Sequence, residues 1–315
     1  MAYGVTDSLG GTIVKLKRYP FVLDLLRRLV KEKPMGTFGG ALVLILLLSG
    51  VFADLLAPYG MNEVHLVDRL LPPSPQYVLG TDQLGRDLLS NIIYGARISV
   101  IIGLSCACCA TLISIAIGAV SGLIGGKFDM AVQRFVDACM CIPTLLLTIT
   151  IMSLVGKGMP QVIAVISITM GIAGSRVIRS AVIGIKENTY VEAAYALGCS
   201  TWRLLVRHIL PNILAPVIIN FTLIVGQAIM IEASLSFLGF GVPPGVPSWG
   251  SMLSAGGRQF MERAPQLALY PGLALALTVY GINMFGDALR DLMDPRLRGG
   301  VGRYKRVEKM IKKTN

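Results

Sequence analysis

Two carboxylates lie within the long apolar stretches of this 315-residue chain. Asp137 lies one turn into one apolar segment, and Glu232 lies near the end of a later one. Because a charged side chain is costly inside a bilayer, an acid in such a position indicates a functional site. Two such acids could couple the movement of a solute to an ion gradient, or they could line a polar path.

The cysteines indicate a second kind of chemistry. Five of the six lie in apolar segments, at positions 106, 108, 109, 139 and 141. Thiolates bind soft metals, but cysteine is also a small apolar residue that packs well in helices. His65 and His208 are predicted to lie on opposite sides of a membrane, so they could not complete one site. We therefore expect packing, with no metal site and no disulfide framework.

Motifs for nucleotide binding and hydrolysis are absent from the sequence. The nearest approach to a phosphate loop is the run Gly125 to Phe128, but Ser121 replaces its first glycine and no Ser or Thr follows Lys127. No GxSxG, HExxH or paired CxxC occurs either. We expect no catalytic residue, no bound cofactor and no ATP hydrolysis by this chain alone.

The composition is that of a membrane protein. Hydrophobic residues make up 54% of the chain and charged residues 15%, with a mean hydropathy of +0.67. A transmembrane helix needs about 20 apolar residues. Six segments reach that length: 38–57, 98–123, 135–156, 160–181, 209–233 and 267–288. We predict an all-α polytopic membrane protein with six spans, and no cleavable signal peptide before the first.

The distribution of Lys and Arg predicts the orientation of these spans. With both termini in the cytoplasm, the cytoplasmic segments hold 23 of the 29 basic residues and the outer segments 6. The net charge of +11 then reflects sidedness and lipid headgroups, and not nucleic acid. The predicted divisions are a cytoplasmic segment 1–37, the first span, an outer loop 58–97, a core 98–288 and a basic cytoplasmic tail 289–315.

Two segments outside the predicted spans are amphipathic or apolar. Residues 21–30 place apolar side chains at 22, 25, 26 and 29, which fits a helix lying in the membrane interface or a solvated tail. The stretch 234–266 is apolar but broken by Gly and Pro. We predict an interfacial or partly re-entrant loop there, with Trp249 at headgroup level.

Residues 189–210 form a polar stretch between two predicted spans. Thr189 to Glu192 has the pattern of a capping box that opens a short helix. Gly198 comes where that helix would stop, and Ser200 or Thr201 could cap a second one. Pro211 suits the first turn of the apolar helix that follows. The pattern predicts a helix-turn-helix lying across the cytoplasmic face.

This stretch resembles the EAA loop of permease subunits of ABC importers. The residues that carry the resemblance are Glu192, Ala193, Ala194, Gly198, Leu210 and Pro211. The family usually has Ile where this chain has His208, but the peptide branch often reads RHILPN, as residues 207–212 do here. The peptide/nickel branch is also matched by LGTD and GRD (79–87), GARIS (95–99), Glu232-Ala233 with LSFLG (235–239), PSWG (247–250), and Gly286-Asp287 through Asp294-Pro295-Arg296.

The resemblance implies the transmembrane subunit of a bacterial importer of peptides, or of a related solute such as nickel, in the inner membrane. It implies a second, homologous permease, two cytoplasmic ATPase subunits that bind ATP and Mg²⁺, and an extracytoplasmic solute-binding protein. The loop residues Glu192, Ala193, Ala194, Gly198, Arg203, His208, Leu210 and Pro211 would dock the ATPase. Glu192 could also act only as a cap, and His208 could be a pH-sensitive contact or a packing residue.

Other residues are candidates for the outer side and for the path. Asp82, Arg86, Asp87 and Trp249 lie in outer segments that could contact the binding protein. Asn220, Gln227 and Glu232 are spaced 7 and 5 apart, which we take to place them within roughly 100° on one helix face. That face, with Asp137, is predicted to line the translocation path, and Arg176 and Arg179 are expected to snorkel.

Two other classes of protein stay open at this point. An ion-coupled secondary transporter could use Asp137 and Glu232, although such carriers often contain inverted repeats and none is visible here. A membrane enzyme could use the cysteine clusters as a redox or metal site.

Overall fold

The computed structural model describes residues 4–6, 12–14 and 21–293. Most of the predicted basic tail, including Asp294-Pro295-Arg296, lies outside the described residues, and so does much of the segment 1–20. Among the described residues, a short antiparallel hairpin of β1 (Gly4–Thr6) and β2 (Thr12–Val14) is the sole sheet. All other regular structure is helical, which confirms the predicted fold class.

The helices follow one another along most of the described chain. They are α1 (Phe21–Glu32), α2 (Pro34–Val51), α3 (Ala53–Leu56), α4 (Leu88–Ile124), α5 (Gly126–Met140), α6 (Thr144–Val155), α7 (Met159–Lys186), α8 (Thr189–Ala196), α9 (Thr201–Leu204), α10 (Leu214–Phe237), α11 (Trp249–Met252) and α12 (Gln266–Met293). Five helical runs in the described residues are long and apolar enough to cross a membrane, and the bent pair α5–α6 would make a sixth.

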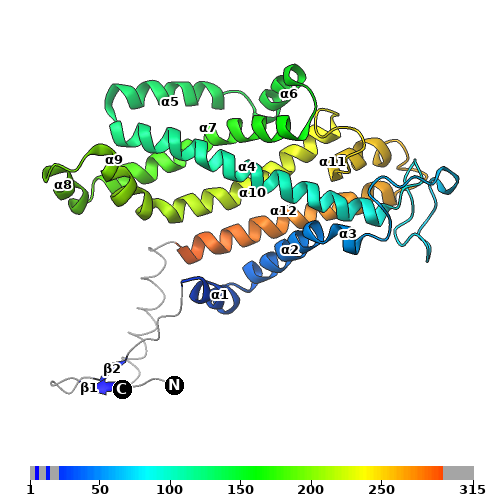
Figure 1. Ribbon diagram of the computed structural model, residues 1–315, viewed down its shortest axis with the longest axis horizontal. Coiled ribbons are helices and arrows are strands. Elements are labelled where there is room, and N and C mark those ends of the chain that lie inside the picture. Colours follow the sequence, from blue (N-terminus) through cyan, green and yellow to red (C-terminus); the bar gives the residue numbers. More distant parts are fainter. Residues whose placement is uncertain (1–3, 7–11, 15–20, 294–315) are drawn as a thin grey trace, which may run out of the picture.

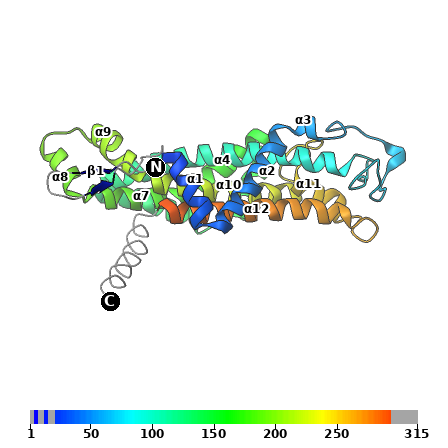
Figure 2. The ribbon, with the colours of Figure 1, turned by 90° about the horizontal axis from the view of Figure 1, so that it is seen from below.

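The long helices lie side by side in a flattened bundle (Figures 1 and 2). α4 lies against α7, α10 and α2, and α12 lies between α2 and α10. α8 and α9 project at one end of the bundle, whereas α3 and α11 lie toward the other (Figure 1). The segments predicted to be cytoplasmic and those predicted to be outside therefore gather at different ends.

Small residues allow the central helices to approach closely. α4 and α7 make the largest helix contact in the bundle. A Cβ atom added to Gly118 of α4 would lie 2.9 Å from the backbone nitrogen of Arg179 on α7. One added to Gly171 of α7 would lie 2.7 Å from the Ile113 side chain on α4. Close backbone approach of this kind is typical of helices packed within membranes.

The third predicted span, 135–156, is not one straight helix. α5 ends at Met140 and α6 begins at Thr144, and the two axes meet at 86°. Pro143 explains the break, because proline lacks an N–H and disfavours helical geometry at the preceding residue. The 12 residues of α6 extend about 18 Å, which is less than the roughly 30 Å core of a bilayer.

The second predicted span, 98–123, lies within a longer helix. α4 starts at Leu88, so the outer loop ends at Asp87 and the residues 95–97 are helical. Asp87 caps the helix: its carboxylate accepts a hydrogen bond from the backbone N–H of Ser90 at 2.8 Å and another from the Ser90 hydroxyl at 2.7 Å. An Asp at this position is a strong helix-start signal that a count of apolar residues does not register.

The amphipathic pattern near the N-terminus does form a helix, α1. Leu29 is buried and packs with Ala288 and Leu292 of α12. Leu26, placed by the pattern on the same face, is 52% exposed. One side of α1 therefore rests on the bundle, and a membrane-interface position for its other side stays a prediction.

Candidate functional site

The predicted turn between the two short helices is present. Gly198 has a φ of +83°, in the left-handed region. Its N–H donates to the Tyr195 carbonyl at 2.9 Å, and the N–H of Cys199 donates to the Ala194 carbonyl at 3.1 Å. This pair of hydrogen bonds is the Schellman motif, which closes a helix and favours glycine. The turn at Gly198 is thus confirmed.

The predicted capping box at Thr189 is wrong. Thr189 is the first residue of α8, Asn188 is its N-cap, and no side chain bonds to the free amides there. The Asn188 carboxamide is used instead by the preceding helix, since its Nδ2 donates to the carbonyls of Gly184 and Ile185 at 3.3 and 3.0 Å. Ser200 does occupy the N-cap of α9, but without a side-chain hydrogen bond.

Pro211 does not begin a new helix. The helical run continues from Thr201 to Phe237, through a π-helical turn at Leu205–Ile209 and a 3₁₀ turn at Leu210–Ile213. A proline within a helix removes one hydrogen bond and crowds the carbonyl four residues earlier, and the wider π turn relieves both effects. The second arm of the loop is therefore continuous with α10.

One face of the loop is anchored in the bundle. Val191 of α8 and Leu204 of α9 are buried, with 2% and 4% of their surface exposed. They pack in a cluster with Leu123 at the end of α4 and with Ile178 and Val182 of α7. The loop is therefore fixed at its base by the ends of two long helices.

The other face of the loop carries large exposed apolar side chains. Tyr195, Leu197 and Trp202 are 68%, 89% and 73% exposed, and we call these three the loop-tip patch. The motif residues Glu192, Ala193, Gly198, Arg203 and Pro211 are exposed as well, whereas Ala194, His208 and Leu210 are half-buried. Apolar patches on an exposed surface mark interaction sites. The sequence analysis missed this patch, although aromatic residues in a polar loop were its visible signal.

An ion pair ties the loop base to α5. Asp129 of α5 accepts from Arg179 of α7 at 2.6 Å (Nε) and 2.5 Å (Nη2), and it also accepts from the Ser121 hydroxyl. Nearby, Lys186 donates to the Leu123 carbonyl at 2.7 Å, at the end of α4. Charges removed from water need partners of this kind. Sequence reasoning did not single out Asp129.

The two arginines that were expected to snorkel are both paired with carboxylates. Arg176 is paired with Asp137 of α5, and Arg179 with Asp129. Asp137 thus joins α5 to α7, and it does not line the groove that contains Asn220 and Gln227.

A groove of about 480 Å³ lies among α6, α7 and α10. Asn220 and Gln227 of α10 line it together with Thr144 and Thr169. Asn220 is 7% exposed, and its Nδ2 atom has no hydrogen-bond partner within the described residues. The structure therefore brings together two of the four residues that were predicted to line the path.

Glu232 lies away from this groove. It is 1% exposed and accepts a hydrogen bond from the Ser236 hydroxyl at 2.6 Å. The predicted grouping within 100° is wrong, because a step of five residues turns a helix by about 140°. Glu232 and Asp137 have separate partners, so the structure does not join them as a pair of coupling acids.

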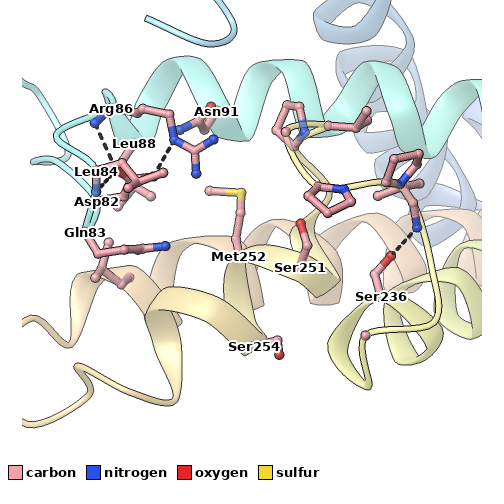
Figure 3. Close-up of a pocket in the computed structure, with 18 of the residues that line it drawn as sticks. Asp82, Gln83, Leu84, Arg86, Leu88, Asn91, Ser236, Ser251, Met252 and Ser254 are labelled. Carbon is pink, nitrogen blue, oxygen red and sulfur yellow. Dashed lines mark hydrogen bonds and ion pairs between the residues drawn. The ribbon is translucent and has the colours of Figure 1, made fainter. Parts of the chain in front are cut away.

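At the other end of the bundle, a cavity of about 380 Å³ lies between the outer loop and the segment after α10. Figure 3 shows Asp82, Arg86 and Asn91 on one side of it, with Ser251 and Met252 facing them. Asp82 is buried and accepts from Arg86 Nε at 2.8 Å and from the N–H groups of Leu84 and Arg86.

Internal contacts thus occupy the carboxylates of Asp82 and Asp87, while Arg86 lines the cavity. Another buried group of the outer loop is Tyr77. Burial, with a hydrogen bond to Asp68 at 2.9 Å, raises the pKa of Tyr77 to about 12. The loop is therefore held by its own polar contacts. Its contact with a binding protein stays a prediction.

Trp249, which was predicted to lie at headgroup level, is buried inside the bundle. It is 3% exposed, and its indole N–H donates to the Ile92 carbonyl of α4 at 3.1 Å. A Cβ added to Gly95 would lie 2.8 Å from the indole ring, so the absence of a side chain there makes room for it. Ser248 caps α11 by a reciprocal capping box with Ser251. The segment is thereby locked against α4.

All six cysteines are free thiols. Cys106 is buried, with its thiol 3.8 Å from the Ile163 carbonyl, whereas Cys108, Cys109 and Cys141 are exposed. In the part of the chain that the structure describes, no three His, Cys, Asp or Glu side chains gather closely enough to hold a metal ion.

Comparisons with known proteins agree with this arrangement. The family described as binding-protein-dependent transport system inner membrane component matches residues 114–299. The N-terminal TM domain of oligopeptide transport permease C matches residues 22–73. The MetNI methionine ABC transporter, solved in inward facing conformations, is similar in fold with a TM-score of 0.54 and 16% identity, covering 65% of this chain and 96% of that one.

Curated relatives match over most of their length. A dipeptide transport system permease protein of Alkalihalophilus pseudofirmus is 36% identical over 85% of this chain and 88% of its own. An oligopeptide transport system permease protein of Bacillus subtilis is 36% identical with the same coverage of 85% and 88%. A glutathione transport system permease protein of Pectobacterium atrosepticum is 36% identical over 86% and 90%. The chain belongs to the family of binding-protein-dependent transport system inner membrane components, and it is a permease of an ABC importer.

Proposed function

We propose that this permease carries di- or oligopeptides across the bacterial inner membrane, driven by ATP that partner subunits bind and hydrolyse with Mg²⁺. Its partners are a homologous permease, two cytoplasmic ATPase subunits and an extracytoplasmic solute-binding protein. Similarity to dipeptide and oligopeptide transport permeases supports the substrate class. Nickel has less support, since the groove among α6, α7 and α10 contains no Cys, His or carboxylate.

The observation that carries the proposal is the two-sided loop. Its exposed face presents the loop-tip patch, and its buried face packs on the ends of α4 and α7. The second arm continues without interruption into α10, which lines the groove. A displacement of the exposed face would therefore be transmitted along this continuous helix to the groove.

The mechanism follows from this connection. ATP binding closes the two ATPases and moves the loop, which tilts α7 and α10 with the bent pair α5–α6. The groove then changes from facing inward to facing outward. Two discrete arrangements of a packed element are the usual basis of such coupling. In this orientation the loop and both termini are cytoplasmic, as the Lys and Arg distribution predicts.

The test is a pull-down from native membranes in mild detergent, with proteomics and ATPase assays on the eluate. Wild type is compared with Glu192→Arg in the loop and with Glu262→Arg, the same charge reversal at an exposed glutamate near the other end. We expect ATPase subunits with wild type and with Glu262→Arg, and their loss with Glu192→Arg. Recovery of no ATPase with wild type in several detergents would contradict the proposal.

A further inference from the structure

The groove lined by Asn220 and Gln227 has a distinct chemistry. Its walls come from three helices, and its polar side chains are two carboxamides and two threonines. No charged residue lines it. Both threonines that line it, Thr144 and Thr169, lie on its α6 and α7 sides, and the Thr169 hydroxyl already donates to the Val165 carbonyl at 2.9 Å. The remaining hydrogen-bonding groups are the Thr144 hydroxyl and the two carboxamides of α10, and each carboxamide offers both a donor and an acceptor.

Asn220 is held in place with an unsatisfied donor. Only 7% of the surface of Asn220 is exposed, and its Nδ2 atom has no hydrogen-bond partner among the described residues. The carboxamide packs against Gly174 of α7, where an added Cβ would lie 3.0 Å from Nδ2. A buried donor without a partner costs free energy. Rotation about the Cβ–Cγ bond would turn that donor toward the groove, where a ligand could satisfy it.

Gln227 lies on nearly the same face, two turns farther along α10, and its side chain is exposed. Seven residues of helix rise about 10 Å. Extended polypeptide rises about 3.3 Å per residue. The two carboxamides are therefore separated along the helix by about the length of three residues of extended chain.

A lipid-facing position would not suit this surface. Polar side chains within spans face other proteins or aqueous paths, because lipid offers them no hydrogen bonds. The groove volume of about 480 Å³ lies within the range of small-ligand sites, about 300–1,000 Å³.

We propose that the groove binds the main chain of a peptide, with the carboxamides of Asn220 and Gln227 pairing with two peptide groups about three residues apart. This inference rests on the proposed function and adds which part of the peptide the permease contacts, its main chain. A carboxamide offers both a donor and an acceptor, as a peptide group does. Because no charged residue lines the groove, we expect the groove not to distinguish peptides by the charge of their side chains. The flexible side chains of Met170 and Met230 can adapt to different residues.

The test compares pentaalanine, whose first and fourth peptide groups are three residues apart, with two analogues in which sulfur replaces the oxygen of the first or of the fourth peptide group, because sulfur is the weaker hydrogen-bond acceptor. The assembled importer in proteoliposomes is supplied with its binding protein, and each peptide is used at concentrations that saturate that protein. The variants are Asn220→Leu and Gln227→Leu. Thr222→Val is the matched control, since Thr222 lies on the same helix and bonds to the Ile219 carbonyl.

Wild type should transport the oxygen peptide about fivefold faster than each sulfur analogue, the effect of one neutral hydrogen bond. Asn220→Leu should slow pentaalanine about fivefold and remove one of the two preferences, and Gln227→Leu should remove the other, whereas Thr222→Val should keep the rate and both preferences. If Asn220→Leu does not assemble, Asn220→Ala removes the carboxamide without adding bulk and should give the same loss. Asn220 variants with wild-type rates and preference would overturn the inference and leave peptide import standing. If wild type transports no peptide of any length tested, the proposed function itself fails.

Discussion

The two ends of the bundle differ in the exposure of their tryptophans. Trp202 lies in the loop at one end and is 73% exposed. Trp249 lies toward the other end, is 3% exposed, and has its indole N–H bonded to α4. One end therefore exposes apolar surface, whereas the other uses its aromatic residue to hold the chain together. The same residue type is thus left exposed at one end and packed at the other.

The largest effect is expected from Trp249→Ala. Removing the indole leaves a cavity against Gly95 and removes the hydrogen bond to the Ile92 carbonyl, so the free energy of unfolding should fall by about 3–5 kcal/mol. Thermal unfolding of the purified permease in detergent measures the change. Trp249→Phe, which fills part of the space, should lose less. Equal unfolding temperatures for wild type and Trp249→Ala would contradict the packing role.

Asp129→Ala should have the next largest effect, at the loop end. It leaves Arg179 partly buried without its carboxylate, which should cost on the order of 3 kcal/mol of stability. The matched control is Asp137→Ala, because the pair of Asp137 with Arg176 is more exposed and should contribute about 1 kcal/mol or less. Thermal unfolding of the two variants side by side distinguishes them. An equal loss in both would show that burial does not set the difference.

Trp202→Ala should affect binding and leave stability within about 0.5 kcal/mol of wild type. An exposed tryptophan in an interface commonly contributes about 2 kcal/mol, so affinity for the ATPase subunits should fall roughly 30-fold. Titration of purified ATPase onto the permease in nanodiscs measures this. Leu154→Ala removes another exposed apolar side chain, 83% exposed on α6, and should leave the affinity unchanged. Unchanged affinity in Trp202→Ala would remove the loop-tip patch from the interface.

The smallest effect is expected from Gly198→Ala. A side chain in the left-handed region costs about 1–2 kcal/mol, so the turn should loosen and the ratio of transport to ATP hydrolysis should fall. Gly184→Ala is the control, because Gly184 is helical and has open space around it. Measuring transport and hydrolysis in the same proteoliposomes gives the ratio. A fall of equal size in both variants would show that the turn is not the cause.

Local patterns in the sequence were enough for several features of this protein. Apolar length gives the helical membrane class, and the residues 192–211 lead to the family. Gly198 could be assigned because a left-handed residue is a property of a few neighbouring residues. Each of these depends on composition or on short spacing.

Contacts between distant segments decided the rest. Trp249 was expected in the headgroups, but Gly95, more than 150 residues away, makes a buried place for it. Arg179 was expected to snorkel, and the turn at Gly125, between α4 and α5, places Asp129 where it pairs with Arg179. The rotation of α10 separates Glu232 from Asn220 and Gln227. By itself, the sequence determined the helical membrane class and where the loop turns, because those depend on local hydrophobicity and backbone preference. Only the tertiary structure decided which polar groups are paired and which face the groove, because helix packing sets those partners.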